Sequence, residues 1–151
     1  MNPLVSIIIP SYKRPPAFVK RAVDSALRQT YENIEVIVVD DNPSGSAARG
    51  ELAALFAEYA GDRRVRAVIN PQNLGGSEAR NEGVKAAKGE YLAFLDDDDE
   101  FRPEKTEKQT AFMLENGLDM SFSDFKLVDD AGRVMDYRQF SDIPAFDQDS
   151  L

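Results

Sequence analysis

The sequence predicts an α/β fold: a mostly parallel, open sheet with helices on both faces. Runs rich in β-branched residues at 4–9 and 34–39 have strand length and no polar alternation, as strands buried on two faces do. Segments with helical spacing of apolar residues alternate with these and later strands, which indicates parallel strands joined by right-handed crossovers. The 151 residues fit one domain, and 42% hydrophobic with 30% charged residues is typical of a globular chain.

Each connecting segment supports this order. Apolar residues recur at helical spacing from Phe18 to Leu27, after a Pro15-Pro16 pair suited to a helix entrance, and again from Ala47 to Tyr59, ending near Gly61. The remaining expected elements are a strand at 65–69, a helix at 79–87 closed by Gly89, a strand at 91–95, a helix at 104–116 capped by Gly117, a strand at 120–128 and a hairpin turn at 129–132 leading to Val134.

Composition restricts the chemistry. The chain has no cysteine and no histidine, which excludes thiolate zinc sites, Cys or His nucleophile pairs and imidazole bases. A bound metal must therefore have oxygen ligands, as magnesium, manganese and calcium do. The net charge of −9 argues against nucleic-acid binding and against a surface for anionic lipid. The N-terminus has neither a basic leader nor the ~20 apolar residues of a membrane span, so we expect a cytoplasmic location.

Polar residues follow all four of the first predicted strands, at 10–14, 40–42, 73–76 and 96–100. Ligands of open α/β sheets bind outside the carboxyl ends of the strands, so these segments predict one site.

Five successive acids, Asp96 to Glu100, need a cation or water to lie together. The first and third carboxylates of an extended Asp96-Asp97-Asp98 segment face one side, where a divalent ion could bridge them to a diphosphate; the alternative is a solvated acidic loop. A calcium loop of the EF type is excluded because Phe101 stands where that loop requires glycine.

Other residues at these strand ends have two interpretations each. Asp41 either accepts a hydrogen bond from a base N–H or satisfies its own turn. Tyr12 either stacks on a nucleobase or packs at the sheet edge. Arg80 either reaches a phosphate or pairs with the acidic run. Gly75-Gly76 either lets the backbone approach a ligand or starts a helix capped near Ser77.

Neither G-x-G-x-x-G nor G-x-x-x-x-G-K-[ST] is present, so phosphates are expected to be held through a metal. An aspartyl-phosphate phosphohydrolase is a weaker alternative, because its D-x-D-x-[TV] motif would follow the first strand, where Pro10-Ser11-Tyr12 stands. A nucleotidyltransferase would need glycine in that loop.

Four segments carry a family resemblance: VSIIIPSYKR, IEVIVVDDNPSG, NLGGSEARNEGVKAAKGEYLAFLDDDDE and FRPEKTEKQ, between residues 5 and 109. In these the chain resembles the inverting glycosyltransferases of family 2, which have the A-type glycosyltransferase fold. The resemblance implies a nucleotide diphospho-sugar donor, a UDP-sugar, and Mn²⁺ or Mg²⁺ to neutralise the departing diphosphate. It implies a base pocket at Pro10 and Tyr12 with Asp41 bonding the base, Arg80 near the nucleotide, Asp96 and Asp97 near ribose and sugar, and Asp98 as metal ligand. Together with Gly75 at the turn, the first six of these residues are our predicted donor-binding residues, and Asp98 is our predicted metal ligand.

Family members continue into an acceptor-binding half that supplies the general base for attack by an acceptor hydroxyl. No residue here matches that role; Asp124, Asp129 and Asp130 are acids without an assignment. We therefore expect residues 1–151 to be one sugar-nucleotide-binding domain of a truncated enzyme. Its acceptor would be a glycan, lipid-linked or other hydroxyl, with peripheral membrane association through the missing regions. A binding module without catalysis is the alternative. Two departures from the family pattern are Lys13, where Asn is common, and Asn42-Pro43-Ser44 after the paired acids.

Overall fold

The computed structural model describes residues 2–129 and 132–138, so the middle of the predicted turn at 129–132 lies outside the described residues. The chain divides into two compact units, Met1–Lys108 and Gln109–Leu151. The first contains β1 (Val5–Ser11), α1 (Pro16–Leu27), β2 (Ile34–Asp40), α2 (Ala47–Ala57), β3 (Val65–Ile69), α3 (Gly76–Ala86) and β4 (Tyr91–Phe94). The helix α4 (Lys105–Asn116) crosses the division, and the second unit contains β5 (Phe125–Val128) and β6 (Val134–Arg138).

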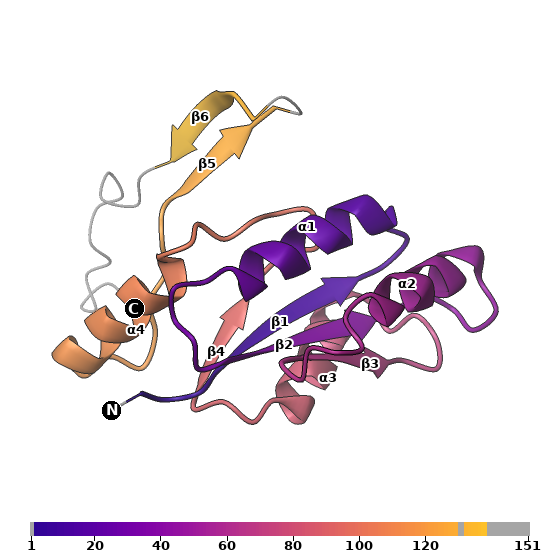
Figure 1. The fold of residues 1–151 in the computed structure, drawn as a ribbon, viewed down its shortest axis with the longest axis horizontal. Helices are drawn as coiled ribbons and strands as arrows, with labels where there is room; N and C mark the ends of the chain where they lie inside the picture. The colour runs from indigo at the N-terminus through magenta and orange to yellow at the C-terminus, as the bar shows by residue number, and fades with distance from the viewer. Residues whose placement is uncertain (1, 130–131, 139–151) are drawn as a thin grey trace, which may run out of the picture. The chain divides into compact units, whose positions relative to one another are not determined.

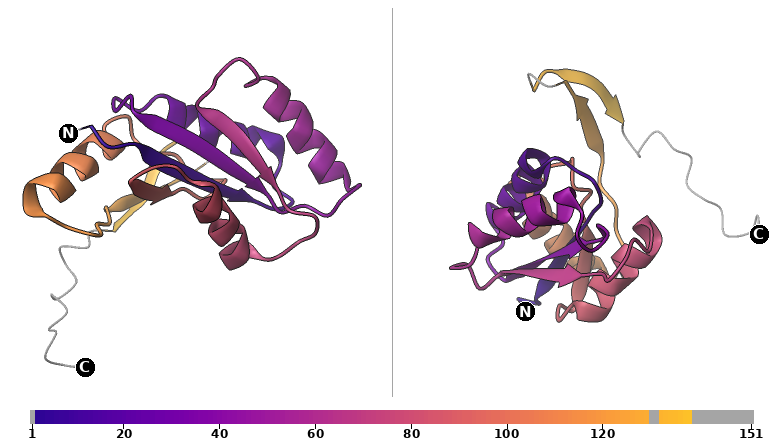
Figure 2. Two further views of the ribbon diagram at one scale, coloured as in Figure 1. Left: turned by 90° about the horizontal axis from the view of Figure 1, so that it is seen from below. Right: turned by 90° about the vertical axis from the view of Figure 1, so that its right-hand side faces the viewer.

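The first unit is built on a four-stranded sheet in the order β3-β2-β1-β4, with every neighbouring pair parallel. Helices α1 and α2 cover one face and α3 covers the other (Figures 1 and 2). This confirms the predicted parallel sheet with helices on both faces.

Side chains of the two central strands alternate between two cores, as the two-residue period of a strand requires. Ile7 and Ile9 of β1 and Val36 of β2 pack with α1 and α2, whereas Ile8 and Ile37 pack on the other face with Ala79 of α3. All five of these strand residues are completely buried, which is why both runs are dominated by apolar residues.

Strand β1 continues past the end expected at Ile9, through Pro10, to Ser11, which pairs with Asp40. The backbone of Ile8 accepts from Leu95 on the β4 side, and Pro10, two residues on, faces the same side. There β4 has already ended, so the missing N–H of Pro10 breaks no ladder bond. The crevice between β1 and the acidic run after β4 opens at this point.

Two glycines of the α3 region serve packing rather than capping. A Cβ at Gly83 would lie 2.4 Å from Cγ2 of Ile8, and one at Gly89 would lie 2.7 Å from the backbone oxygen of Leu4. The helix ends at Ala86 with Ala87 as its C-cap, so the prediction of Gly89 as the closing residue was wrong. Its N-cap is Gly75 and no side chain caps it, so a cap near Ser77 was also wrong.

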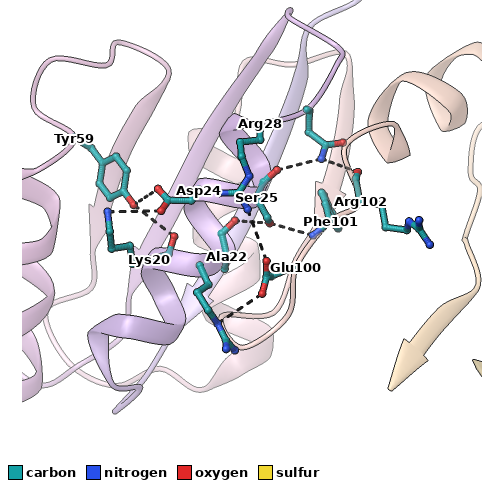
Figure 3. Close-up of polar contacts among 11 residues, drawn as sticks. Lys20, Ala22, Asp24, Ser25, Arg28, Tyr59, Glu100, Phe101 and Arg102 are labelled. Atoms are coloured by element: carbon teal, nitrogen blue, oxygen red, sulfur yellow. Dashed lines mark hydrogen bonds and ion pairs between the residues drawn. The ribbon is translucent and has the colours of Figure 1, made fainter. Parts of the chain in front are cut away.

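Helix α1 fixes the segment that follows the acidic run (Figure 3). The Ser25 hydroxyl accepts from the backbone N–H of Phe101, 3.0 Å away, and Glu100 lies 3.8 Å from the guanidinium of Arg28. The buried amide of Gln29 donates to the backbone oxygen of Arg102 and accepts from the N–H of Thr106. The acidic run is therefore tethered to the sheet at one end and to α1 at the other.

In the second unit, β5 and β6 form the predicted antiparallel hairpin. The expected strand at 120–128 was too long, since only Phe125–Val128 is strand. Gly117 follows α4 with a φ of 62°, the left-handed conformation expected of a residue that ends a helix. Among the helices that the structure describes, none is long and apolar enough to cross a membrane.

Candidate functional site

A cleft of about 600 Å³ opens at the carboxyl ends of β1, β2 and β4. It is lined by every residue predicted for donor and metal binding: Pro10, Tyr12, Asp41, Gly75, Arg80, Asp96, Asp97 and Asp98. Ser11, Arg14, Asn73, Gly76 and Ala79 complete its lining. The sheet therefore brings the whole predicted set to one place, while the role of each residue stays a prediction.

Asp41 anchors the turn that precedes α3. Its carboxylate accepts from the side-chain amides of Asn70 and Asn73, each at 2.7 Å, and from the backbone N–H groups of Leu74 and Gly75 at 2.9 and 3.0 Å. A carboxylate offers about four lone-pair sites, and all are in use. Of the two interpretations of Asp41, the structure shows the local one, in which the carboxylate satisfies its own turn. A nucleobase could bond Asp41 only by replacing one of these four donors.

A second buried acid, Asp40, organises the turn after β2 together with α2. Its carboxylate accepts from the backbone and side-chain amides of Asn42, and Arg49 lies 3.4 Å from it. The Arg49 guanidinium also donates to the backbone oxygens of Asn42 and Asn70, which joins the turns after β2 and β3. Sequence reasoning missed Arg49, since an arginine in an ordinary helical pattern gives no signal of its own.

The two departures from the family pattern are in contact. The side-chain oxygen of Asn42 accepts from the backbone N–H of Lys13 at 2.7 Å. Lys13 has a φ of 53°, and in the described part of the chain no other non-glycine residue has a positive φ. Asparagine adopts this left-handed conformation more readily than lysine, which gives a physical reason for asparagine at this position in the family.

The acidic run is held together by arginines from three directions. Asp96 pairs with Arg80 of α3, and the guanidinium of Arg14, from the loop before α1, lies 2.9 Å from both Asp97 and Asp98. Glu100 pairs with Arg21 and Arg28 of α1. Partial burial and the carboxylates of Asp98 and Asp96 raise the pKa of Asp99. We expected a cation or water beside these acids, and the structure provides arginine side chains. Of the two interpretations of Arg80, the structure shows the pairing with the acidic run.

Ser11 carries an orphan polar atom. The residue is 3% exposed and lines the cleft, and its hydroxyl has no hydrogen-bond partner among the described residues. Buried hydroxyls usually have partners, so this one points to a ligand. Tyr12 beside it is 43% exposed, which leaves part of its ring accessible for stacking, and the Lys13 ammonium lies over the ring, 5.0 Å from its centroid.

No group of three or more acids able to enclose a metal occurs among the described residues. Asp96 and Asp98 have half-exposed carboxylates in the cleft, 55% and 43%. This donor set suits an ion such as Mg²⁺ or Mn²⁺, which takes one or two carboxylates and completes its shell with water and substrate phosphates.

Arg14, Ser11 and Asn73 were missed as site residues. All three stand in the polar segments that follow the predicted strands, so their positions in the sequence alone could have identified them as candidates. Their partners could not be predicted, because Arg14 and Asp97 are far apart in sequence and meet only through the β1–β4 pairing.

Comparisons with known proteins agree with this geometry. The glycosyl transferase family 2 model matches residues 6–149. The chain is 36% identical over 135 residues to the putative teichuronic acid biosynthesis glycosyltransferase TuaG of Bacillus subtilis, covering 89% of this chain and 52% of TuaG. It is 34% identical over 125 residues to the UDP-Glc:alpha-D-GlcNAc-diphosphoundecaprenol beta-1,3-glucosyltransferase WfgD of Escherichia coli, covering 83% of this chain and 47% of WfgD.

The fold is shared with the mannosyltransferase PcManGT of Pyrobaculum calidifontis, solved in complex with GDP-Man and Mn²⁺. The TM-score is 0.61 at 24% identity, over 74% of this chain and 32% of PcManGT. The predicted A-type glycosyltransferase fold is thus confirmed, and the chain spans about half the length of the two bacterial relatives. A family match over almost the whole chain, with the expected sheet and cleft beneath it, shows that this chain belongs to glycosyl transferase family 2.

Proposed function

We propose that this chain is the donor-binding part of a glycosyltransferase that uses a nucleotide diphospho-sugar, specifically a UDP-sugar, and transfers the sugar with inversion to an acceptor hydroxyl. One observation carries the proposal: a cleft at the carboxyl ends of the strands combines an exposed aromatic ring, a buried hydroxyl without a partner in the described part of the chain, half-exposed carboxylates and two arginines. The aromatic ring suits a base, and the charged residues suit a metal-bound diphosphate.

Each group has a task in this proposal. Tyr12 offers its ring to the base, and the Ser11 hydroxyl offers a hydrogen bond to the nucleoside. Arg80 and Arg14 provide guanidinium donors for phosphate oxygens. Asp98, helped by Asp96, would hold Mn²⁺ or Mg²⁺, which when bound supplies positive charge for the departing diphosphate. The name of WfgD specifies a UDP-sugar and the PcManGT complex contains Mn²⁺, which supports both choices by analogy.

The part of the reaction that needs the acceptor is assigned to no residue here. Deprotonation of the acceptor hydroxyl requires a base beside the anomeric carbon. WfgD acts on a diphosphoundecaprenol-linked sugar by name, and we propose an acceptor of the same broad kind, a lipid-linked or other glycan hydroxyl.

The first experiment is calorimetric titration of the chain with UDP, GDP and dTDP, each with and without Mn²⁺. We expect Mn²⁺-dependent binding of UDP in preference to the other two. Asp98→Ala should lower the UDP affinity measured with Mn²⁺ by about tenfold or more, because loss of a metal ligand costs at least as much as loss of the groups that orient it.

The matched control is Glu100→Ala, which removes a carboxylate from the same acidic run but outside the lining of the cleft. It should keep UDP affinity close to that of the wild-type chain. If no nucleotide binds with Mn²⁺ although the chain is folded by circular dichroism, or if both variants lose affinity equally, the proposed donor site is wrong.

A further inference from the structure

Arg14 makes a contact that its neighbours in the cleft do not make: one guanidinium joins two successive carboxylates. Its Nε donates to Oδ1 of Asp97 at 2.9 Å, and its Nη2 lies 2.9 Å from Oδ2 of Asp98. The planar fork of arginine allows both contacts at once, whereas the ammonium of lysine is a single point charge.

The two carboxylates differ in exposure. The side chain of Asp97 is 8% exposed, and that of Asp98 is 43% exposed. A buried carboxylate needs its partner, so the bond to Asp97 is the lasting one. An ion pair with an exposed carboxylate is weak and exchanges easily, so the contact with Asp98 is the one that a competitor can replace.

We infer that Arg14 is a positioning residue that occupies the metal-binding carboxylate of Asp98 in the free protein and yields it when donor and metal bind together. This inference rests on the proposed function. Asp97 keeps the guanidinium at the cleft throughout. After the exchange, the freed Nη2 still points into the cleft and can donate to the diphosphate that arrives with the ion.

This arrangement couples the binding of the metal to the binding of the nucleotide. Without nucleotide, a divalent ion must displace Arg14 from Asp98, and the displaced guanidinium nitrogen gains no new acceptor in return. With a nucleoside diphosphate present, the displaced donor finds phosphate oxygens. Arg14 therefore weakens binding of the metal alone and strengthens binding of the metal with nucleotide, and the two effects have opposite signs.

The test compares Arg14→Gln with the wild-type chain in two titrations: Mn²⁺ alone, followed by electron paramagnetic resonance of free Mn²⁺, and UDP at saturating Mn²⁺, followed by calorimetry. We expect Arg14→Gln to bind Mn²⁺ alone roughly three- to fivefold more tightly, the size of one partly exposed ion pair. Its UDP affinity at saturating Mn²⁺ should fall by at least about the same factor. Arg14→Lys is the second variant, for use if Arg14→Gln fails to fold. It keeps a cation for Asp97 but cannot bridge both acids, so its Mn²⁺ and UDP affinities should change in the same directions as those of Arg14→Gln.

The matched control is Arg21→Gln, which removes the same charge from a pair with Glu100 outside the cleft lining. Equal tightening of Mn²⁺ in Arg21→Gln would assign the effect to general charge and overturn the inference, as would weaker Mn²⁺ binding in both Arg14 variants. The Mn²⁺ titration without nucleotide tests Arg14 directly. Failure of the wild-type chain to bind UDP with Mn²⁺ would instead refute the proposed function.

Discussion

At the scale of single residues, the hydrogen-bonding groups of Asp41 and Ser11 in the cleft differ in whether the described part of the chain supplies them with partners. The buried carboxylate of Asp41 has its acceptor sites filled by Asn70, Asn73 and the backbone of the turn before α3. The hydroxyl of Ser11 is buried without a partner among the described residues. A satisfied group supports the fold, whereas an unsatisfied one in a cleft lowers stability until a ligand arrives.

Ser11→Ala should therefore separate stability from binding. Removing an unsatisfied buried hydroxyl should leave the melting temperature unchanged or raise it, while UDP affinity falls by about 0.5–1.5 kcal/mol, the worth of one hydrogen bond. Thermal denaturation and calorimetry measure the two effects. The control is Ser25→Ala, whose hydroxyl donates to Ala22 and accepts from Phe101 and whose loss should lower stability. A drop in melting temperature for Ser11→Ala would mean that its hydroxyl has a structural partner.

At the scale of elements, the distance between α3 and the sheet depends on a glycine. A Cβ at Gly83 would meet Cγ2 atoms of Ile8 at 2.4 Å and Val39 at 3.2 Å. Since α3 carries Arg80 and follows its N-cap Gly75, its distance from the sheet also sets where one wall of the cleft lies.

Gly83→Ala should destabilise the chain by about 1–3 kcal/mol, because an added methyl in a packed interface forces the backbone or its neighbours to move. Gly50→Ala in α2 is the matched substitution: nothing lies within 4 Å of its Cβ position. It should stabilise by roughly 0.5–1 kcal/mol through helix propensity. Urea unfolding of both variants measures the difference. Equal effects in the two would show that α3 can shift on the sheet without cost.

At the scale of the whole molecule, the pH dependence of stability has a specific contribution from Lys105. Burial lowers the pKa of Lys105 to about 8, and its ammonium lies 3.8 Å from the ring centroid of Phe101. An unfolded lysine has a pKa of about 10.4, so between these values the unfolded chain binds more protons than the folded chain. The contribution of Lys105 to the free energy of unfolding therefore rises as the pH increases from about 8 to about 10.4. Below pH 8 the folded state bears the full cost of burying the charged ammonium.

Lys105→Met should remove this dependence. The variant should be more stable than the wild-type chain at pH 7, and the advantage should shrink as the pH rises past 8. Lys88→Met, which removes the same charge from an exposed position, is the control. Urea denaturation from pH 7 to pH 10 measures both. A constant difference between Lys105→Met and wild type across this range would contradict the lowered pKa.

Most of the first unit could be predicted because its strands are uninterrupted buried runs such as Ile7–Ile9, and because parallel strands bring their carboxyl ends to one edge. The sequence could not show that Pro10 lies within a strand, since this depends on where β4 stops pairing with β1. It could not separate the two interpretations of Asp41, because its partners come from the turn after β3. The strand expected at 120–128 was overextended because apolar residues near Met120 suggested a longer run than the observed β5.

The four hydrogen bonds at Asp41 also affect the speed of binding. A base that bonds this carboxylate cannot simply dock, because a resident donor such as the Asn73 amide must leave first. The turn before α3 then has to rearrange for every nucleotide that enters by this route. Association would be limited by that rearrangement rather than by diffusion, and its rate would level off as nucleotide concentration rises.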